Sequence, residues 1–521
     1  MDIGGYIDYH ARFRGDQLGV VFDDQRLSWR AFNVRVERLA AALRACGVVT
    51  GDRVATVLAN HLELLDVYWA CARLGAVAVP LSPLLMKDGL SSLLRDAAPK
   101  VVFASAATAA PVAAACAELA GSPEAIAHRV LVDGDTDSFV AYDRFIAAPI
   151  AVSPAPTCGT RADYPRIDPD SLYNIMYTSG TTGMPKGIMI THRVRALYAS
   201  LFANAWRMTP ESVVLHTGAI VFNGAFLTLL PAFALGATYI LHRQFTAESF
   251  IETVAREKVT HTFMVPAQIA SVLASPCFSP EKLASLQMLG SVGAPLPVAQ
   301  KDKLEALLPG RFHELYGLTE GIMTILDKRD VIKKRGSVGP PMPYTEMRIV
   351  SEAGKDLPPG EVGEIVARGP LLMAGYYQRP DLTAAAVLDG WLYTGDLGFL
   401  DADGYLFLVD RKKDMIDTGG VKVYPRDIEE VIARHPAVQE AVVFGIPDAK
   451  WGETPVAAVQ LIAGTSLNAE ALQGWINERV AARYQRVSKV DLVANFPRNA
   501  AGKVLKRELR DVYWQNQENK I

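Results

Sequence analysis

The segment Tyr177-Thr-Ser-Gly-Thr-Thr-Gly-Met-Pro-Lys186-Gly187 places four Ser or Thr hydroxyls, three glycines and one lysine within eleven residues. It follows an apolar stretch, residues 172–177, that is expected to form a strand. Glycines let a backbone fold around a ligand, hydroxyl and N–H groups donate to phosphate oxygens, and a lysine supplies positive charge. The segment is not a Walker A loop, because Lys186 is followed by glycine rather than by Ser or Thr. A flexible polar turn would not explain so many hydroxyls, so the pattern predicts a phosphate-binding loop.

The residues before this loop alternate between short apolar strands and amphipathic helices. Ser28 is expected to cap one helix, and Asn60 is expected to open another that runs to about Leu74. Strands are expected over residues 54–58 and 76–80. Such alternation predicts a fold of α/β layers with mostly parallel sheets.

The pattern of apolar and turn-forming residues changes after about residue 335. Short apolar segments separated by turn signals, such as Asp389-Gly390, predict a small antiparallel β unit that extends to residue 410. A compact α+β region is expected to follow over residues 414–521, with a helix over 426–434 and a strand over 440–444.

Composition restricts the classes of protein to which the chain can belong. Its 521 residues are too many for one ordinary core, and 50% apolar with 21% charged residues is typical of a globular protein. The formal charge of −3 provides no general attraction to nucleic acid or to anionic membranes. Residues 213–241 carry no charged side chain, but Asn223 and Pro231 favour a buried helix and strand over a membrane span. Five scattered cysteines and the absence of a visible secretory signal favour a cytoplasmic protein.

Two hydrolase classes are disfavoured by their missing motifs. No Gly-x-Ser-x-Gly sequence is present, and His313-Glu314 lacks the second histidine of a His-Glu-x-x-His helix. Ser279 and Lys282 match Ser-x-x-Lys, but Pro280 between them is better explained as the start of a helix.

The phosphate-binding loop resembles that of the adenylate-forming superfamily, which includes acyl-CoA synthetases, adenylation domains and beetle luciferases. Further motifs of that superfamily follow in the same order, up to residue 503. They are Gly290-Ser-Val-Gly-Ala-Pro295, Tyr316-Gly-Leu-Thr-Glu320, Tyr393-Thr-Gly-Asp396, Asp410-Arg-Lys-Lys-Asp-Met-Ile416 with Gly419-Gly420, and Pro497-Arg-Asn-Ala-Ala-Gly-Lys503. The resemblance implies a large N-terminal domain of α/β layered sheets (1–410), including the β unit at 335–410. It also implies a hinge at 411–413 and a small, mobile α+β C-terminal domain at 414–521.

The resemblance implies an ATP- and Mg²⁺-dependent ligase that joins an apolar carboxylic acid, fatty or aromatic, to AMP, releases pyrophosphate and passes the acyl group to coenzyme A. An adenylation enzyme that loads a carrier protein is an alternative, because it would share every nucleotide motif. A catalytically silent nucleotide-binding protein of the same fold is another. The sequence is compatible with a homodimer without requiring one.

The resemblance also implies roles for individual residues. Lys503 would neutralise charge at the α-phosphate, Thr319 would contact that phosphate, and Glu320 would bind Mg²⁺. Tyr316 would stack on adenine, and Asp396 would accept the ribose hydroxyls with Arg411 as a second ribose contact. The hinge residue would be Lys413. The residues expected to bind ATP or AMP are Thr178, Ser179, Gly180, Thr181, Thr182, Gly183, Lys186, Gly293, Ala294, Pro295, Tyr316, Asp396 and Arg411.

The acid is expected to lie against a mostly apolar wall, which suits an aliphatic or aromatic tail and disfavours a dicarboxylate or an amino acid. The family's His-x-x-Gly element is replaced here by Val221-Phe-Asn-Gly224, and either Val221 or Phe222 would take the aromatic position. Gly419 and Gly420 would line the channel for the pantetheine arm of coenzyme A. The residues expected to bind the acyl group are Val221, Phe222, Gly224, Phe226, Val265, Gly290, Gly317, Leu318 and Met323.

Overall fold

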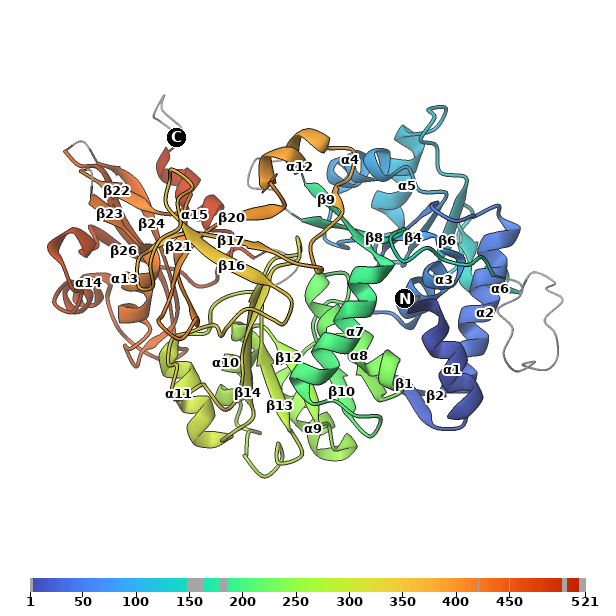
Figure 1. Ribbon diagram of the computed structural model, residues 1–521, viewed down its shortest axis with the longest axis horizontal. Helices are drawn as coiled ribbons and strands as arrows, with labels where there is room; N and C mark the ends of the chain where they lie inside the picture. The colour runs from blue at the N-terminus through green and yellow to red at the C-terminus, as the bar shows by residue number, and fades with distance from the viewer. Residues whose placement is uncertain are drawn as a thin grey trace. The chain divides into compact units, whose positions relative to one another are not determined.

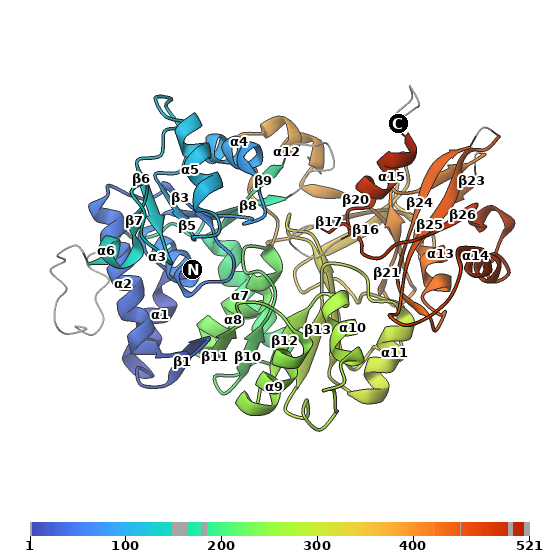
Figure 2. The ribbon, with the colours of Figure 1, turned by 180° about the vertical axis from the view of Figure 1, so that it is seen from behind.

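A computed structural model of the chain describes residues 3–147, 164–178, 185–419, 421–448, 450–498 and 504–514 (Figures 1 and 2). The chain divides into two compact units. Unit 1 comprises Met1–Gly290, Gly317–Ile322 and Gly369–Ala385, and unit 2 comprises Ser291–Tyr316, Met323–Arg368 and Ala386–Ile521. The predicted hinge at 411–413 falls inside unit 2, and the division there into two domains stays a prediction.

Unit 1 contains a mixed sheet whose neighbouring strands are parallel from β8 to β7, while β9 and β18 run antiparallel to their neighbours. The strand order is β18 (Gly375–Tyr376), β9 (Lys186–Thr191), β8 (Leu172–Thr178), β4 (Val77–Leu81), β3 (Arg53–Val57), β5 (Val101–Ala104), β6 (His128–Leu131) and β7 (Val140–Ala141). Helices α4 (Lys87–Ala97) and α5 (Ala109–Glu118) cover one face, where Leu94 and Val112 pack with Val57 and Val79. Figure 1 shows α2 (Trp29–Ala45) and α3 (Leu62–Leu74) on the opposite side.

A second set of strands in unit 1 is parallel except at one edge. Its order is β12 (His261–Met264), β10 (Val213–His216), β11 (Thr238–Leu241), β1 (Leu18–Phe22) and the antiparallel β2 (Gln25–Ser28). Helix α7 (His192–Trp206) packs on β8 and β9, α8 (Phe226–Leu235) packs on β10 and β11, and the two helices pack on each other. The remaining helical segments in or near unit 1 are η1 (Ile3–Gly5), α1 (Tyr6–Phe13), α6 (Tyr142–Ile146), η2 (Asn223–Ala225), α9 (Ala247–Glu257), α10 (Pro266–Ala274) and α12 (Pro380–Ala386).

Unit 2 contains the predicted antiparallel β unit and the predicted α+β region. Strands β14 (Phe312–Gly317) and β15 (Met323–Leu326) lie at the ends of its first two segments, which also contain α11 (Val298–Leu307), and β13 (Met288–Ser291) leads into the first. The antiparallel sheet has the order β16 (Glu346–Val350), β17 (Gly363–Arg368), β20 (Trp391–Leu400) and β19 (Val387–Leu388), with β21 (Leu406–Arg411) also paired to β20.

The last sheet of unit 2 has helices on both faces. Its order is β23 (Val421–Val423), β22 (Ile416–Thr418), β25 (Gly452–Leu461) and β24 (Val438–Asp448), with β26 (Lys489–Leu492) paired to β25. Helices α13 (Pro425–Ile432) and α14 (Ala469–Asn477) bury Ile428 and Leu472 on one face. On the other face Val442 and Phe444 contact α15 (Lys506–Trp514). The one remaining helical turn in the described part of this unit is η3 (Arg483–Gln485).

Local sequence signals predicted several of these elements. The side chain of Ser28 accepts a hydrogen bond from the Ala31 amide at the start of α2, as expected of an N-cap. The α/β layers and the antiparallel β unit are confirmed. Residues 213–241 form β10, α8 and β11. Among the described residues, no helix is long and apolar enough to cross a membrane.

The helix predicted to run to about Leu74 is confirmed as α3, but Asn60 does not open it. Helix α3 begins at Leu62, after His61. The Asn60 amide nitrogen instead donates to the carbonyls of Gly218 and His242 at 2.7 and 2.8 Å, and its oxygen accepts from the Ile220 amide at 2.9 Å. The side chain is therefore a buried connection between distant loops, which explains why a local capping rule failed.

Candidate active site

The predicted phosphate-binding loop joins two antiparallel strands, β8 and β9, with Thr178 opposite Lys186 in the register. The predicted ligands Ser179, Gly180, Thr181, Thr182 and Gly183 lie outside the described residues. Gly187 has a packing reason to be glycine, because a Cβ there would lie 2.8 Å from Cγ2 of Ile175. Its small size therefore allows the strand pair to close.

Lys186 and Glu320 lie on either side of one tyrosine. The Lys186 ammonium lies 4.9 Å from the centre of the Tyr376 ring, and the Tyr376 hydroxyl donates to Glu320 Oε1 at 2.9 Å. Tyr376 reaches this position because β18 pairs with β9, which places it opposite Ile188. Burial raises the pKa of Tyr376, and the negative charge of Glu320 adds to the rise, so the hydroxyl stays a donor. The structure thus brings the predicted phosphate-binding lysine near the predicted metal-binding carboxylate.

A tight turn fixes the position of Glu320. The Gly321 amide donates to the Leu318 carbonyl, and the Glu320 carbonyl accepts from the Met373 amide at 2.8 Å. Gly321 has φ of +110°, and a Cβ there would lie 1.9 Å from the Leu371 carbonyl oxygen. Only glycine fits this approach, so the turn that carries Thr319 and Glu320 is held against the chain at 371–373.

Glu320 fits a magnesium ion that is held mainly by phosphate oxygens. No group of three or more His, Cys, Asp or Glu that could hold a metal by itself occurs among the described residues. Mg²⁺ bound with nucleotides commonly takes one or two protein carboxylates and completes its shell with phosphate and water. Glu320 is half-buried and its Oε1 accepts the hydrogen bond from Tyr376, so a single carboxylate of this kind fits an ion whose other ligands are phosphate and water oxygens.

In unit 2, the three residues predicted to bind adenosine are in contact. The Tyr316 hydroxyl donates to Asp396 Oδ2 at 2.8 Å, and Arg411 Nε lies 3.3 Å from Asp396 Oδ1. Asp396 and Arg411 are opposite each other in the pairing of β20 with β21. Asp396 is 7% exposed, and its own amide is bound by Thr394 Oγ1. This is a fixed carboxylate beside an aromatic ring and a guanidinium, which suits a ribose and its base.

A buried ion pair supports the loop with the predicted ligands Gly293, Ala294 and Pro295. Glu314 and Lys301 form an ion pair in which each side chain is 2% exposed. The other carboxylate oxygen of Glu314 accepts from the Leu296 amide at 3.0 Å. Glu314, which was considered above as part of a metallopeptidase motif, therefore stabilises this loop through its bonds to Lys301 and Leu296.

The predicted acyl-binding segment follows β10 and is held by two side chains from other elements. Asn60 fixes Gly218 and Ile220 as described above, and the Tyr68 hydroxyl donates to the Ile220 carbonyl at 2.8 Å. Among the predicted wall residues, Val221 and Phe226 are buried, whereas Phe222 and Gly224 are partly exposed.

The other predicted acyl-binding residues are distributed over both units. Val265, Gly317 and Leu318 are half-buried in unit 1, and Met323 is buried in unit 2. Gly290 packs under Phe263, because a Cβ there would lie 2.5 Å from the ring.

The predicted coenzyme A and hinge residues are described only in part. Gly419 has φ of +61° and its amide donates to the Trp451 carbonyl, while a Cβ would lie 2.8 Å from the indole. Burial lowers the pKa of Lys413, which lies in the turn after β21. Gly420 and the predicted catalytic Lys503 lie outside the described residues.

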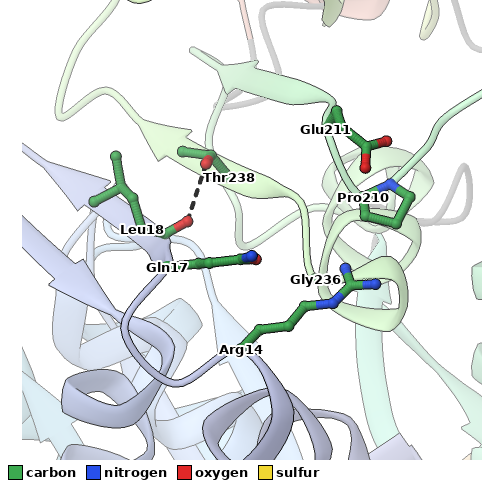
Figure 3. A pocket seen from close by; sticks show the side chains of 7 residues that line it. All are labelled: Arg14, Gln17, Leu18, Pro210, Glu211, Gly236 and Thr238. Atoms are coloured by element: carbon green, nitrogen blue, oxygen red, sulfur yellow. Dashed lines mark hydrogen bonds between the residues drawn. The ribbon is translucent and has the colours of Figure 1, made fainter.

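A surface pocket in unit 1 contains none of the predicted site residues. Figure 3 shows it between the end of α1, the start of β1 and the segment before β10. The Thr238 hydroxyl donates to the Leu18 carbonyl at 3.0 Å, and Arg14 donates to the Leu235 carbonyl at 2.7 Å. Two of its polar side chains, Arg14 and Thr238, are thus engaged with the backbone.

Comparison with known proteins assigns the family. Residues 7–377 match the model of the AMP-binding enzyme, and residues 427–503 match that of the AMP-binding enzyme C-terminal domain. The chain belongs to the AMP-binding enzyme family. It is 34% identical to a feruloyl-CoA synthase from Amycolatopsis sp over 98% of each chain, and 34% identical to the long-chain-fatty-acid–CoA ligase FadD13 of Mycobacterium tuberculosis over 94% of each. The ATP-bound MatB from Rhodopseudomonas palustris has a similar structure, with a TM-score of 0.86 and 29% identity over 98% of this chain and 99% of MatB.

These comparisons confirm three predictions about this AMP-binding enzyme. They are its place in the acyl-CoA ligase branch of the adenylate-forming superfamily, its α/β fold class, and its class as an AMP-forming acid–thiol ligase. The family also accounts for ATP and coenzyme A as co-substrates.

Sequence reasoning missed Tyr376, Glu314, Asn60 and Arg195, which contact predicted site residues or the segment that carries them. Tyr376 stands in a Gly-Tyr pair with no local signal of a ligand, and Glu314 was considered only for another enzyme class. Arg195 lies on α7, three residues after the His192 that starts the helix, and donates to Asn223. Each acts through a partner that is distant in the sequence.

We expect Asn60→Leu to lower the free energy of unfolding by about 2–4 kcal/mol, because three backbone groups lose a buried partner. Urea denaturation followed by tryptophan fluorescence measures the change. Asn468→Ala is the matched control: it removes the N-cap of α14, which costs about 1 kcal/mol. An Asn60 variant no less stable than that control would show that the three bonds contribute little.

Proposed function

We propose that this ligase activates a carboxylic acid with an apolar aliphatic or aromatic body, using ATP and Mg²⁺, and transfers the acyl group to coenzyme A. The contact of Lys186 and Glu320 through Tyr376 supports the proposal most directly, because a metal–phosphate complex would need a cation and a carboxylate close together. The cluster of Tyr316, Asp396 and Arg411 supports the proposal as well, because these groups suit an adenosine.

In the first reaction, a carboxylate oxygen of the acid forms a bond to the α-phosphorus of ATP. The bond from that phosphorus to the bridging oxygen breaks, and pyrophosphate leaves with the electron pair. Lys186 would hold phosphate oxygens, Thr319 would contact the α-phosphate, and Lys503 would neutralise charge there as the bond forms. A Mg²⁺ ion held by Glu320 would supply further neutralisation of phosphate charge.

In the second reaction, the thiol of coenzyme A attacks the acyl carbon of the adenylate. The acyl carbon–oxygen bond breaks, AMP leaves, and the thiol proton is released to solvent. Rotation of the C-terminal region about Lys413 would exchange Lys503 for the segment at Gly419 and Gly420, which would line the pantetheine channel. The proposal places the enzyme in the cytoplasm and is compatible with a monomer or a homodimer.

The test is pyrophosphate release with ATP and Mg²⁺ across a panel of aliphatic, aromatic and steroid-like acids, with and without coenzyme A. We expect an acid with an apolar body to trigger release, and an acyl-CoA product to form when coenzyme A is present. Release with an acyl-adenylate but no thioester would move the acceptor to a carrier protein. No release with any acid from folded protein would contradict the proposal and favour a silent nucleotide-binding protein.

A further inference from the structure

Tyr376 contacts the side chains of both Lys186 and Glu320 within unit 1. Its hydroxyl donates to Glu320 Oε1 at 2.9 Å, and the centre of its ring lies 4.9 Å from the Lys186 ammonium. A phenol hydroxyl and an aromatic ring carry no net charge, so neither contact cancels the charge of the lysine or of the carboxylate. A direct ion pair between the two would instead reduce the charge that each offers to a phosphate or a metal ion.

Tyr376 is buried, with 6% of its surface exposed, whereas Lys186 and Glu320 are half-buried. Its amide donates to Thr383 Oγ1 at 2.9 Å, and its strand β18 pairs with β9. A tyrosine side chain has few rotatable bonds, whereas lysine and glutamate side chains have more and lose more rotamer freedom when they are fixed. Tyr376 is therefore a fixed point to which the more flexible Glu320 side chain is bound.

Backbone hydrogen bonds hold the chain just before Tyr376 independently of the tyrosine side chain. The Met373 amide donates to the Glu320 carbonyl at 2.8 Å, and the Ala374 amide donates to the Met189 carbonyl at 2.9 Å. These bonds join the turn that carries Glu320 to the strand that carries the lysine. The hydroxyl of Tyr376 is not required for that connection, so its bond acts on the direction of the carboxylate and not on the place of the turn.

We propose that Tyr376 is a positioning residue that orients the Glu320 carboxylate for a Mg²⁺ ion bound together with ATP. The inference rests on the proposed function and adds a determinant of its metal dependence. Groups that are hydrogen-bonded to a metal-binding side chain fix its direction, and their loss commonly lowers metal affinity or activity by about 10- to 100-fold. Tyr376 fixes the carboxylate in this way while it also contacts Lys186, and it leaves both charges available to the metal–nucleotide complex.

The test measures ATP binding by isothermal titration calorimetry in the absence of any acid, so that no adenylation takes place. The magnesium gain is defined as the Kd for ATP in EDTA divided by the Kd in saturating Mg²⁺. We expect this gain to lie well above 1 in the wild-type enzyme and to fall about tenfold, or to close to 1, in Tyr376→Phe. The Kd in EDTA should change little, because the ring beside Lys186 and the backbone bonds remain. The Mg²⁺ concentration that gives half-maximal pyrophosphate release should rise in parallel.

Tyr164→Phe is the matched control. The Tyr164 hydroxyl donates to Glu37 Oε1 at 2.7 Å, so the variant removes the same kind of bond from the same unit but contacts no predicted site residue. Its magnesium gain should equal that of the wild-type enzyme. Glu320→Gln should itself bring the gain close to 1, and adding Tyr376→Phe to it should change the gain no further, because a residue that acts through Glu320 then has no carboxylate to orient.

Three results would overturn the inference. An unchanged magnesium gain in Tyr376→Phe would show that the hydroxyl does not orient the metal-binding carboxylate. Weaker ATP binding by the same factor in EDTA and in Mg²⁺ would leave the ratio unchanged and make Tyr376 a structural support only. A further fall of the gain when Tyr376→Phe is added to Glu320→Gln would mean that Tyr376 acts through another group. A wild-type enzyme that binds no ATP would instead contradict the proposed function, so the two failures are distinguishable.

Discussion

Lys503→Ala is expected to reduce acid-dependent pyrophosphate release by about 100- to 1,000-fold, while the transfer of an acyl group from a supplied acyl-adenylate to coenzyme A persists. Removing one preoriented donor from a developing oxyanion costs this much in other enzymes. The second reaction builds no comparable charge at the phosphorus, so it should not need the same ammonium. Measuring pyrophosphate release and thioester formation separately, on the same protein preparation, checks both halves of the expectation.

The control for this prediction is Arg507→Ala, which removes another cation a few residues further along the chain. The Arg507 side chain is 65% exposed and, among the described residues, pairs with Asp511 on the surface of α15, so its loss should change neither reaction by more than about twofold. A Lys503 variant in which both reactions fall together would point to a damaged C-terminal region instead of a missing catalytic charge. If pyrophosphate release were unchanged in Lys503→Ala, Lys503 would have no role in adenylation.

The elements and the family could be predicted from the sequence, because the residues that determine a cap, a turn or a motif lie within a few positions of the element that they shape. Ser28 caps the helix that begins one residue later, and the hydroxyl-rich motif follows the strand that leads into it. The antiparallel β unit has its turns where Asp389-Gly390 and Gly404 adopt positive φ. In each case the determining residue and its partner are only a few positions apart.

The remaining features depend on contacts between distant segments, and no local pattern encodes them. Asn60 is of a residue type that often caps helices, but its hydrogen-bond partners are 158 to 182 positions away in the sequence. Glu314 and Tyr376 likewise act on loops that only the sheet order brings near. A single sequence cannot show such pairing, because any buried polar residue has many candidate partners until the topology is known.

The cluster of Lys186, Tyr376 and Glu320 and the cluster of Tyr316, Asp396 and Arg411 differ in the kinds of contact that join their side chains. The side chains of Lys186, Tyr376 and Glu320 are connected by one hydrogen bond and one cation–π contact, so an incoming phosphate could displace the lysine at low cost. In the other cluster, Asp396 is held by both a hydrogen bond from Tyr316 and an ion pair with Arg411. The carboxylate is thus preorganised, and its charge should be the larger determinant of nucleotide affinity.

Asp396→Asn is expected to lower kcat/KM for ATP by about 100-fold, mainly through KM. A carboxylate can accept from two ribose hydroxyls, and each hydrogen bond to a charged group contributes about 1.5–3 kcal/mol, whereas an amide offers one acceptor and no charge. The comparison variant Tyr316→Phe removes the hydroxyl bound to Asp396 but keeps the ring and the carboxylate. Its effect should stay below about tenfold, because the carboxylate that would bind the ribose and the ring that would stack on adenine both remain.

The ribose assignment is tested with 2′-deoxy-ATP, which lacks one of the hydroxyls that Asp396 would accept. Wild-type enzyme should use it less well than ATP, and Asp396→Asn should discriminate much less between the two, because the partner of the missing hydroxyl is already weakened. Asp403→Asn, which neutralises a carboxylate that is 71% exposed in the turn before β21, should retain the wild-type preference. If Asp396→Asn kept both the KM for ATP and the discrimination against the deoxynucleotide, Asp396 would serve only to fix Tyr316 and Arg411, and the ribose contact would belong to another residue.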